Sequence, residues 1–558
     1  MPTSQPHLRP WLRPFLLILA LFVVAFGFTA YAVQFSEAAG RLTTAPNYDD
    51  CVYLLRAVTL LDEAEEGGVQ GFMESLASRP VHSPYSVFMS TAAYGVTDNA
   101  EAAPYWSNMA IVVLFLSGVT WWFRKLPIPI IVCAWLAFLS VPFAGLMVME
   151  FRPDPLWAVV TGFGVCWIWM DERATSAPWR SMLAGLLFGA ALVIKPTTFA
   201  MTVLVFISSW VGRQILTAIF HSQSWKQQAW KMNLGFLMAL ALMAGPYFLY
   251  NGAYVWGYFW DNSFGINKDV WQHPGDLREQ ITYYLTGGGG ESNIGVPGTI
   301  LLVSGALAGL FWLWKSNWEK RLQLAALFCA LFCVYAVNVY GNAKTPFLGG
   351  AIYSIAYFFA AACLAHVATR MFEGAKWKKY TVYGASLALA GVLLFLQTWP
   401  PYSVWNRKLA GTYETNTEAF SLLLSRYEEA LPDIVLLTQL GPVVPEALSM
   451  QIIDHDWPVR VLSMAFDRDP LKTAKEQEPG TWIVTPEPGT MGTTPHLPIE
   501  ENLGMFIDWL DTNPEWEVLT RWSTLDGNEI ITWVKQPATE ELPSPDLEEA
   551  LPVQSASE

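Results

Sequence analysis

The chain is poor in charge. Only 15% of its 558 residues are charged, whereas a soluble protein of this length carries roughly a quarter. Hydrophobic residues make up 53% of the sequence, and the mean hydropathy is +0.30. The net charge of −15 leaves no basic excess to neutralise phosphates, which excludes a nucleic-acid-binding protein. The composition therefore indicates an integral membrane protein, and its 27 tryptophans fit the aromatic rings that line membrane interfaces.

Cysteine is also scarce, and the six cysteines form no disulfide framework. Only Cys51 lies in a polar stretch. The other five lie in apolar runs and are predicted to be small buried hydrophobic residues: Cys133, Cys166, Cys329, Cys333 and Cys363. The sequence has no Asn-x-Ser/Thr sequon, which favours a bacterial membrane over a secretory-pathway membrane.

Ten apolar segments are long enough to cross about 30 Å of hydrocarbon. They cover residues 14–33, 106–123, 128–148, 155–170, 181–212, 233–251, 298–314, 322–340, 346–368 and 380–398. The first segment follows Arg9 and Arg13 and is similar to a signal sequence. Its apolar run is too long for one and no cleavage pattern follows, so we expect a retained span.

Segment 181–212 contains Lys195-Pro196 in its middle. One straight helix of that length would overshoot the bilayer, and proline disfavours helix at the residue before it. One kinked helix and two short spans are both possible. Counting two spans places every basic cluster on the side of the N-terminus, as the positive-inside rule requires if that side is cytoplasmic. The sequence thus predicts about eleven spans, with loops 34–105 and 252–297 outside the cytoplasm.

Residues 399–558 are more polar and are predicted to lie outside the cytoplasm. Short apolar strands alternate there with helical stretches. The strands are expected at 434–438, 459–463, 481–485, 517–522 and 529–534. We therefore expect an all-α membrane bundle over 1–398, an extracytoplasmic α/β domain over 399–537, and a disordered acidic tail over 538–558.

Several ionisable residues fall at the predicted external membrane face: Asp49, Asp50, His82, Arg152, Asp154 and Lys195. Each has an ordinary structural interpretation, because aspartate can cap a helix, histidine can pack in a hydrogen-bonded niche, and lysine can extend to the interface. Their shared position argues for more, since ionisable groups at membrane depth tend to have partners or ligands. Cations there suit a phosphate, and a neighbouring carboxylate suits a general base.

The first external loop resembles that of the GT-C glycosyltransferases, a superfamily that includes protein O-mannosyltransferases and the lipid A aminoarabinose transferase. The resemblance lies in Tyr48-Asp49-Asp50-Cys51-Val52-Tyr53-Leu54, in His82-Ser83-Pro84-Tyr85 and in the apolar run that ends at Tyr94-Gly95. The segments Arg152-Pro153-Asp154 and Gly189 to Lys195-Pro196-Thr197 also look like parts of that family. In layout the likeness covers about residues 10–400.

The resemblance implies a GT-C bundle that moves a sugar from a polyprenyl-phosphate donor to an acceptor hydroxyl, with inversion of the anomeric centre. The acceptor class is open between lipid, glycan and protein. Asp49 matches the catalytic position, and Asp50 would support it. The departing phosphate would be bound by His82, Arg152 and Lys195, and by Lys344 where many relatives carry an Arg-Tyr pair. The substrate contacts would be Tyr48, Tyr85 and Asp154.

Other interpretations stay open. The pair Asp49-Asp50 is compatible with Mg²⁺ or Mn²⁺ and requires neither. The alternative functions are a polytopic transporter or flippase and a non-catalytic envelope assembly protein. Transporters commonly contain inverted repeats and interrupted helices near the midplane, whereas this sequence has no internal repeat and its breaks lie at the predicted external face.

Overall fold

The computed structural model describes residues 11–38, 48–78, 83–97, 102–149, 151–171, 177–268, 275–286, 294–341, 347–373, 376–396, 423–425, 427, 431–438, 445–455, 457–465, 467–486, 498–523 and 529–537. The chain forms two compact units, Met1–Thr415 and Asn416–Glu558. The domain boundary expected near residue 398 and the tail expected over 538–558 lie outside the described residues.

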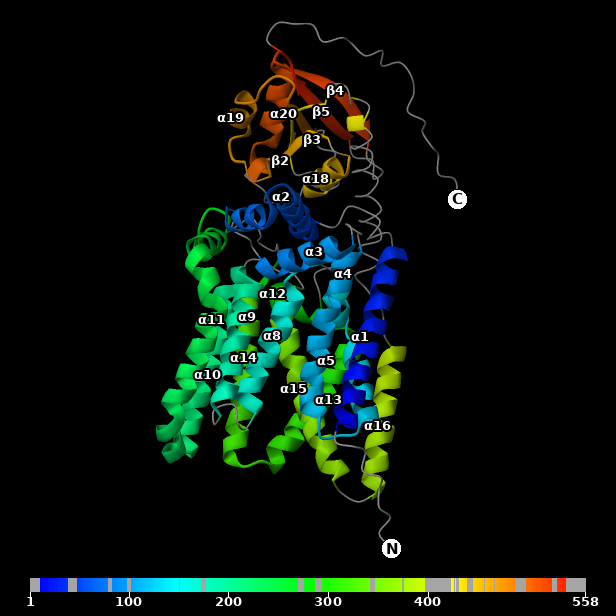
Figure 1. The fold of residues 1–558 in the computed structure, drawn as a ribbon, viewed down its shortest axis with the longest axis vertical. Coiled ribbons are helices and arrows are strands. Elements are labelled where there is room, and N and C mark those ends of the chain that lie inside the picture. Colours follow the sequence, from blue (N-terminus) through cyan, green and yellow to red (C-terminus); the bar gives the residue numbers. More distant parts are fainter. Residues whose placement is uncertain are drawn as a thin grey trace. The chain divides into compact units, whose positions relative to one another are not determined.

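The N-terminal unit is built from helices (Figure 1). They are α1 (Leu12–Ala38), α2 (Tyr48–Ser78), α3 (Pro84–Thr97), α4 (Ala103–Ser107), α5 (Met109–Phe123), α6 (Ile128–Leu139), α7 (Pro142–Met149), α8 (Asp154–Met170), α9 (Pro178–Ile194), the 3₁₀ turn η1 (Pro196–Thr198), α10 (Phe199–Phe220), α11 (Ser222–Ser263), α12 (Leu277–Thr286), α13 (Gly295–Lys315), α14 (Trp318–Tyr340), α15 (Gly350–Phe372) and α16 (Lys376–Phe395).

Every predicted span coincides with a helix or a broken helix. Among the described residues, seven helices are long and apolar enough to cross a membrane: α1, α4–α5, η1–α10, α11, α13, α14 and α15. The pair α6–α7, bent by 78°, makes an eighth. Helices α8 and α9 are shorter apolar helices of 17 residues, about 25 Å long. The chain is therefore a multi-pass membrane protein, as predicted.

The fifth apolar segment is broken at Lys195, as the sequence predicts. Helix α9 ends at Ile194, and α10 begins at Phe199 after the turn η1. Pro196 has no N–H to donate and disfavours helix at Lys195, whose φ of −134° and ψ of 80° are not helical. The break places the lysine at the junction of two helices rather than in the middle of one.

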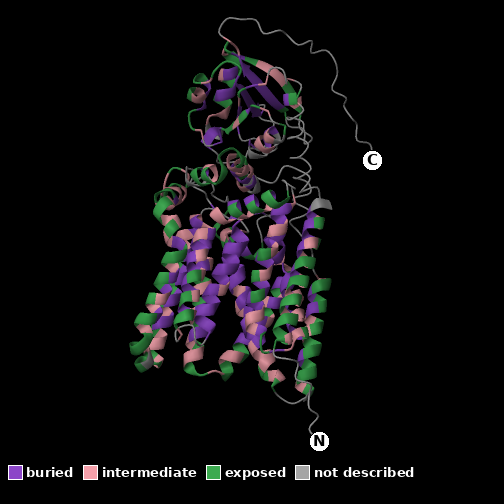
Figure 2. Ribbon diagram, viewed as in Figure 1, coloured by how far each residue is buried: buried purple, intermediate pink, exposed green. Residues whose placement is uncertain are grey.

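The core of the bundle lies along α8 and the first two-thirds of α15, which are almost entirely buried. Figure 2 shows buried residues on the inner helices and exposed residues on the outer ones, such as α1 and α11. Glycine allows the close approach of the two core helices, because a Cβ on Gly162 would overlap Ser354 of α15. Small residues at such contacts are typical of membrane helix packing.

The prediction that the cysteines in apolar runs are buried is wrong for two of them. Cys166 and Cys363 are buried and Cys133 is half-buried, but Cys329 and Cys333 of α14 are exposed. A membrane helix has no polar face toward its surroundings, since lipid tails are as apolar as leucine. An apolar run therefore does not reveal which of its faces meets protein and which meets lipid.

The C-terminal unit contains a mixed five-stranded sheet of order β2-β1-β3-β5-β4. Its strands are β1 (Ile434–Leu437), β2 (Arg460–Ser463), β3 (Trp482–Pro486), β4 (Trp516–Ser523) and β5 (Glu529–Lys535). Strands β2, β1 and β3 are parallel, and β5 is antiparallel to both of its neighbours. All five lie where the sequence predicts them. The expected α/β fold is confirmed.

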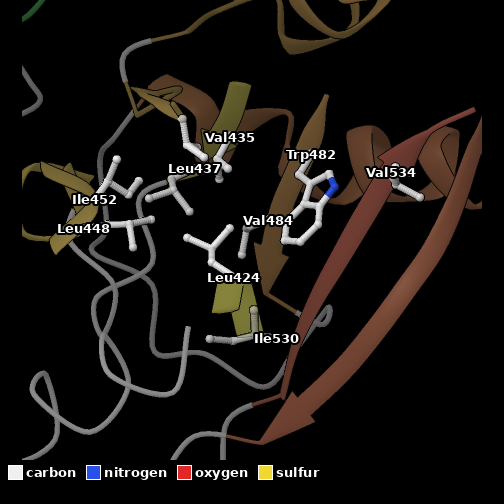
Figure 3. Close-up of a cluster of buried hydrophobic side chains, with 10 residues drawn as sticks. Leu424, Val435, Leu437, Leu448, Ile452, Trp482, Val484, Ile530 and Val534 are labelled. Atoms are coloured by element: carbon white, nitrogen blue, oxygen red, sulfur yellow. The ribbon is translucent and has the colours of Figure 1, made fainter. Parts of the chain in front are cut away.

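Helices complete this unit: α18 (Pro445–Asp454), α19 (Pro470–Lys475), η3 (Pro498–Glu501) and α20 (Leu503–Thr512). The core joins β1, β3 and β5 to Leu448 and Ile452 of α18 (Figure 3). The ring of Trp482 closes one side of this core and packs edge-on against Tyr427, with ring centroids 5.3 Å apart. Strands β1, β3 and β5 are buried along nearly their whole length, whereas β2 and β4 at the two edges are more exposed, which accounts for the continuous apolar runs of the inner strands.

Candidate functional site

An ion pair joins the start of α8 to the break between α9 and α10. Lys195 Nζ donates to Asp154 Oδ1, and the two side chains are only 13% and 9% exposed. Asp154 is the first residue of α8, and Pro153 occupies the N-cap position with no side-chain cap hydrogen bond. The interpretation of Asp154 as a helix cap is therefore wrong, because its carboxylate binds the lysine of another helix.

Hydrogen bonds on both sides of the break hold Lys195 in place. Its carbonyl oxygen accepts from the N–H of Thr198 at 3.1 Å and from Thr198 Oγ1 at 2.9 Å. One turn further on, Thr202 Oγ1 accepts a 2.9 Å hydrogen bond from Trp157 Nε1 of α8. The hydrogen bond from Trp157 to Thr202 thus helps to fix α8 against α10. The ammonium group of Lys195 is fixed at the ion pair with Asp154.

The start of α3 packs on the end of α9 beside the same lysine. Ser83, which is fully buried, donates from Oγ to the carbonyl oxygen of Ile194 at 2.7 Å and accepts from the N–H of Ser86 at 3.4 Å. The serine therefore caps α3 and also satisfies a carbonyl at the C-terminus of α9. This contact brings the segment Ser83-Pro84-Tyr85 next to Lys195.

Tyr85 follows in the first turn of α3. Burial raises the pKa of its hydroxyl to about 12, because desolvation disfavours the phenolate. The hydroxyl is therefore neutral at physiological pH and can donate a hydrogen bond. Since α3 begins beside Lys195, this donor belongs to the same region of the bundle.

The start of α15 forms another wall. Arg152 Cζ lies 4.2 Å from the centroid of the Phe347 ring, a cation–π contact that orients the guanidinium. Gly350 packs closely on α8, since a Cβ there would lie 2.9 Å from Ala158 Cβ and 3.9 Å from the carbonyl oxygen of Asp154. A glycine at position 350 is needed for α15 to begin this near to Asp154.

These contacts together form a positively charged region of the bundle. Helices α3, α8 and α15 all begin there, and the start of a helix carries partial positive charge from its free N–H groups. Arg152 and Lys195 add two full positive charges, and Asp154 supplies one negative charge. Such a positively charged region is chemically suited to an anionic group, in particular to the oxygens of a phosphate.

The structure brings together three of the predicted site residues, Arg152, Asp154 and Lys195, and α3 begins beside them with Tyr85 in its first turn. Tyr48, Asp49 and Asp50 form the first turn of α2, but their side chains lie outside the described residues, as do His82 and Lys344. Helix α2 packs on α3, where Ser90 Oγ donates to the carbonyl oxygen of Tyr53 at 3.3 Å. Tyr53 is one helical turn beyond Asp49, so the helix that carries the acidic pair contacts the helix that begins at the site.

The sequence-based predictions assign no functional role to three residues that help to form the site: Ser83, Phe347 and Gly350. A serine directly before proline at a helix start is a cap signal, and it identifies Ser83 from the sequence alone. No local signal identifies the other two residues. Among the described residues, no group of three His, Cys, Asp or Glu side chains is placed to hold a metal ion, and the side chains of Asp49 and Asp50 lie outside that set.

Neither a protein-family model nor a curated protein sequence matches the chain. Among solved structures, apo ArnT from Cupriavidus metallidurans is similar over 91% of this chain and 98% of its own, with a TM-score of 0.52 and 11% identity. The same enzyme bound to undecaprenyl phosphate aligns over 90% of this chain and 97% of its own, with a TM-score of 0.49 and 12% identity. The chain thus has the fold of apo ArnT, a multi-span helical bundle followed by a C-terminal unit with a small sheet, as the sequence predicts.

Proposed function

We propose that this protein is a membrane glycosyltransferase that moves a sugar from a polyprenyl-phosphate donor to an acceptor hydroxyl, with inversion of the anomeric centre. The observation that carries the proposal is the buried Asp154–Lys195 pair beside Arg152, at the junction of three helix starts. Charged groups at membrane depth are costly and mark ligand sites. The ArnT fold and the family-like residues of loop 34–105 support the same activity.

The proposed chemistry divides between two groups of residues. Asp49 takes the proton of the acceptor hydroxyl, and Asp50 supports it. As the bond from the sugar to the phosphate breaks, negative charge grows on the phosphate oxygens, and cations fixed nearby lower the energy of that transition state. Arg152 and Lys195 fill this role, with His82 and Lys344 as further phosphate-binding residues. Tyr48, Tyr85 and Asp154 contact the substrate.

The ion pair itself leaves Lys195 able to bind phosphate. An ammonium has three N–H donors, and the hydrogen bond to Asp154 Oδ1 uses one of them. The carboxylate holds the flexible lysine side chain in one position before the donor arrives, which reduces the entropy lost on binding. Asp154 therefore acts in the proposal as the residue that positions Lys195.

Donor binding tests this function. The purified full chain in detergent is expected to bind a polyprenyl phosphate at least about tenfold more tightly than the polyprenol that lacks the phosphate, since charge-assisted hydrogen bonds contribute about 1.5–3 kcal/mol each. Arg152→Gln should remove most of that preference. Isothermal titration or native mass spectrometry measures it.

The matched control is Arg321→Gln, because Arg321 is an exposed arginine near the start of α14 that hydrogen-bonds backbone carbonyls of α13. Equal affinities for the two lipids in the wild-type chain would contradict the proposal.

A transporter or flippase would bind the donor and move it without breaking the bond to the sugar. Release of free polyprenyl phosphate from a labelled donor in proteoliposomes therefore separates the enzyme from that alternative.

We further propose that the site and the C-terminal unit lie outside the cytoplasm, with the N-terminus inside. The support is the distribution of basic clusters among the loops. Single cysteines at Gly341 and Glu373, on either side of α15, test it in a cysteine-free background. An impermeant maleimide added to intact cells should label position 341 and not position 373, and the reverse pattern or labelling of both would contradict this orientation.

A further inference from the structure

A cavity of about 430 Å³ lies between α10 and the first half of α11. It is separate from the site described above: its residue Gln214 is 19 residues beyond Lys195, which corresponds to about 28 Å along a helix. The Asp154–Lys195 pair does not line it. The proposed transfer reaction makes no use of this cavity.

Two indoles and two amides form the polar part of the cavity. Trp210 Nε1 donates to Asn233 Oδ1 at 2.9 Å, and Trp225 Nε1 donates to Gln214 Oε1 at 2.8 Å. Trp210 is itself fixed by stacking on Phe236, with ring centroids 4.5 Å apart and planes 8° from parallel. Because each amide oxygen is held by an indole, the orientation of each amide is set, and its NH₂ group is left as the free end.

The amide NH₂ of Gln214 has no acceptor among the described residues, although the residue is only 8% exposed. A buried donor without a partner costs about 1–3 kcal/mol, so such a group calls for an explanation. A ligand that brings oxygen acceptors into the cavity would supply one.

The charged residues of α10 and α11 favour an anionic ligand. Helix α10 and α11 up to Trp260 contain no acidic residue, while Arg213, Lys226 and Lys231 are basic. Lys226 is exposed and lies seven residues before Asn233, which places the two on the same face of α11. No charged residue among those described lines the cavity itself, so the charge of its surroundings is set by these cations and by Glu319 of α14, which lies 3.2 Å from His221 Nε2 at the turn between α10 and α11.

The rim of the cavity is apolar and open to the surroundings of the bundle. Val211, Ile215 and Ile219 line it and are 48%, 54% and 64% exposed. In a membrane these side chains contact acyl chains rather than water. An apolar rim contributes no binding energy to a soluble anion. A lipid, by contrast, would pack its acyl chains on the rim and place its head group against the amides. Tryptophan is also the residue that is enriched at head-group level.

We propose that this cavity binds the phosphodiester head group of an anionic glycerophospholipid. Gln214 donates to a phosphate oxygen, Lys226 balances the charge, and the acyl chains lie along Val211, Ile215 and Ile219. The proposal stands independently of the transferase activity, because it rests on the other end of α10.

Native mass spectrometry of the full chain, with phosphatidylglycerol and phosphatidylcholine of the same acyl chains, tests the site. The wild-type chain should bind phosphatidylglycerol about tenfold more tightly. Gln214→Glu keeps an oxygen acceptor for Trp225, removes the donor and adds a negative charge. It should abolish this preference, whereas Gln227→Glu makes the same charge change at an exposed position of α11 and should leave the preference intact.

A second variant guards against misfolding of the first. Lys226→Gln changes an exposed side chain and should reduce the preference several-fold, and Lys378→Gln on α16 should not. Equal binding of the two lipids by the wild-type chain, or equal effects of the Gln214 and Gln227 variants, would overturn the proposal. Competition by millimolar inorganic phosphate alone would also overturn it, since that result would identify a site for a soluble anion.

Discussion

Asp49→Asn is expected to lower the rate of sugar transfer by about 10²–10⁴-fold, the range that a general base contributes. Asparagine has nearly the same size as aspartate and cannot accept the proton of the acceptor hydroxyl. The variant should still bind the polyprenyl phosphate, because in the proposal that affinity comes from Arg152 and Lys195. The measurement is the initial rate of transfer from a labelled donor at saturating concentration, so that the loss appears in kcat rather than in KM.

The control for this variant is Glu66→Gln, an exposed acid on the same helix. It removes one negative charge from α2 and should leave the rate unchanged. If the Asp49→Asn variant keeps a rate within a factor of about three of wild type, Asp49 is not the general base, even if donor binding behaves as expected. Loss of both binding and rate would instead indicate that Asp49 holds the structure together.

Local rules of backbone chemistry account for what the sequence predicts correctly. The break at Lys195 follows from Pro196, and the start of α8 follows from the prolines on both sides of Asp154. The five strands follow from short apolar runs between turn residues. Each of these features is set by residues close together in the chain, so the sequence contains the whole cause.

The contacts that assemble the site have a different origin. Asp154 and Lys195 are 41 residues apart, and Ser83 is 111 residues from Ile194. Which residue meets which depends on how the helices pack, and that depends on small residues such as Gly162 and Gly350 and on the rotation of each helix. The charge pattern brings Arg152, Asp154 and Lys195 to one membrane face, but it does not pair them.

Removal of either partner of the Asp154–Lys195 pair should destabilise the protein strongly. Both side chains are about nine-tenths buried, and breaking such a pair leaves one charge without compensation at a cost of about 3–5 kcal/mol. Lys195→Met and Asp154→Asn, each alone, should therefore reduce the temperature or denaturant midpoint of unfolding in detergent well below that of the wild-type chain.

The double variant Asp154→Asn/Lys195→Met should recover part of the lost stability, because it buries no unpaired charge and leaves only a neutral amide where the carboxylate was, at a cost of about 1–3 kcal/mol. It should not recover binding of polyprenyl phosphate, because the ammonium that meets the phosphate is gone. One double-mutant cycle, measured once by stability and once by binding of polyprenyl phosphate, thus separates the structural role of the ion pair from the role of Lys195 in binding phosphate. Additive losses of stability in the double variant would show that the two charges do not interact, and full donor binding by the double variant would remove Lys195 from the phosphate site.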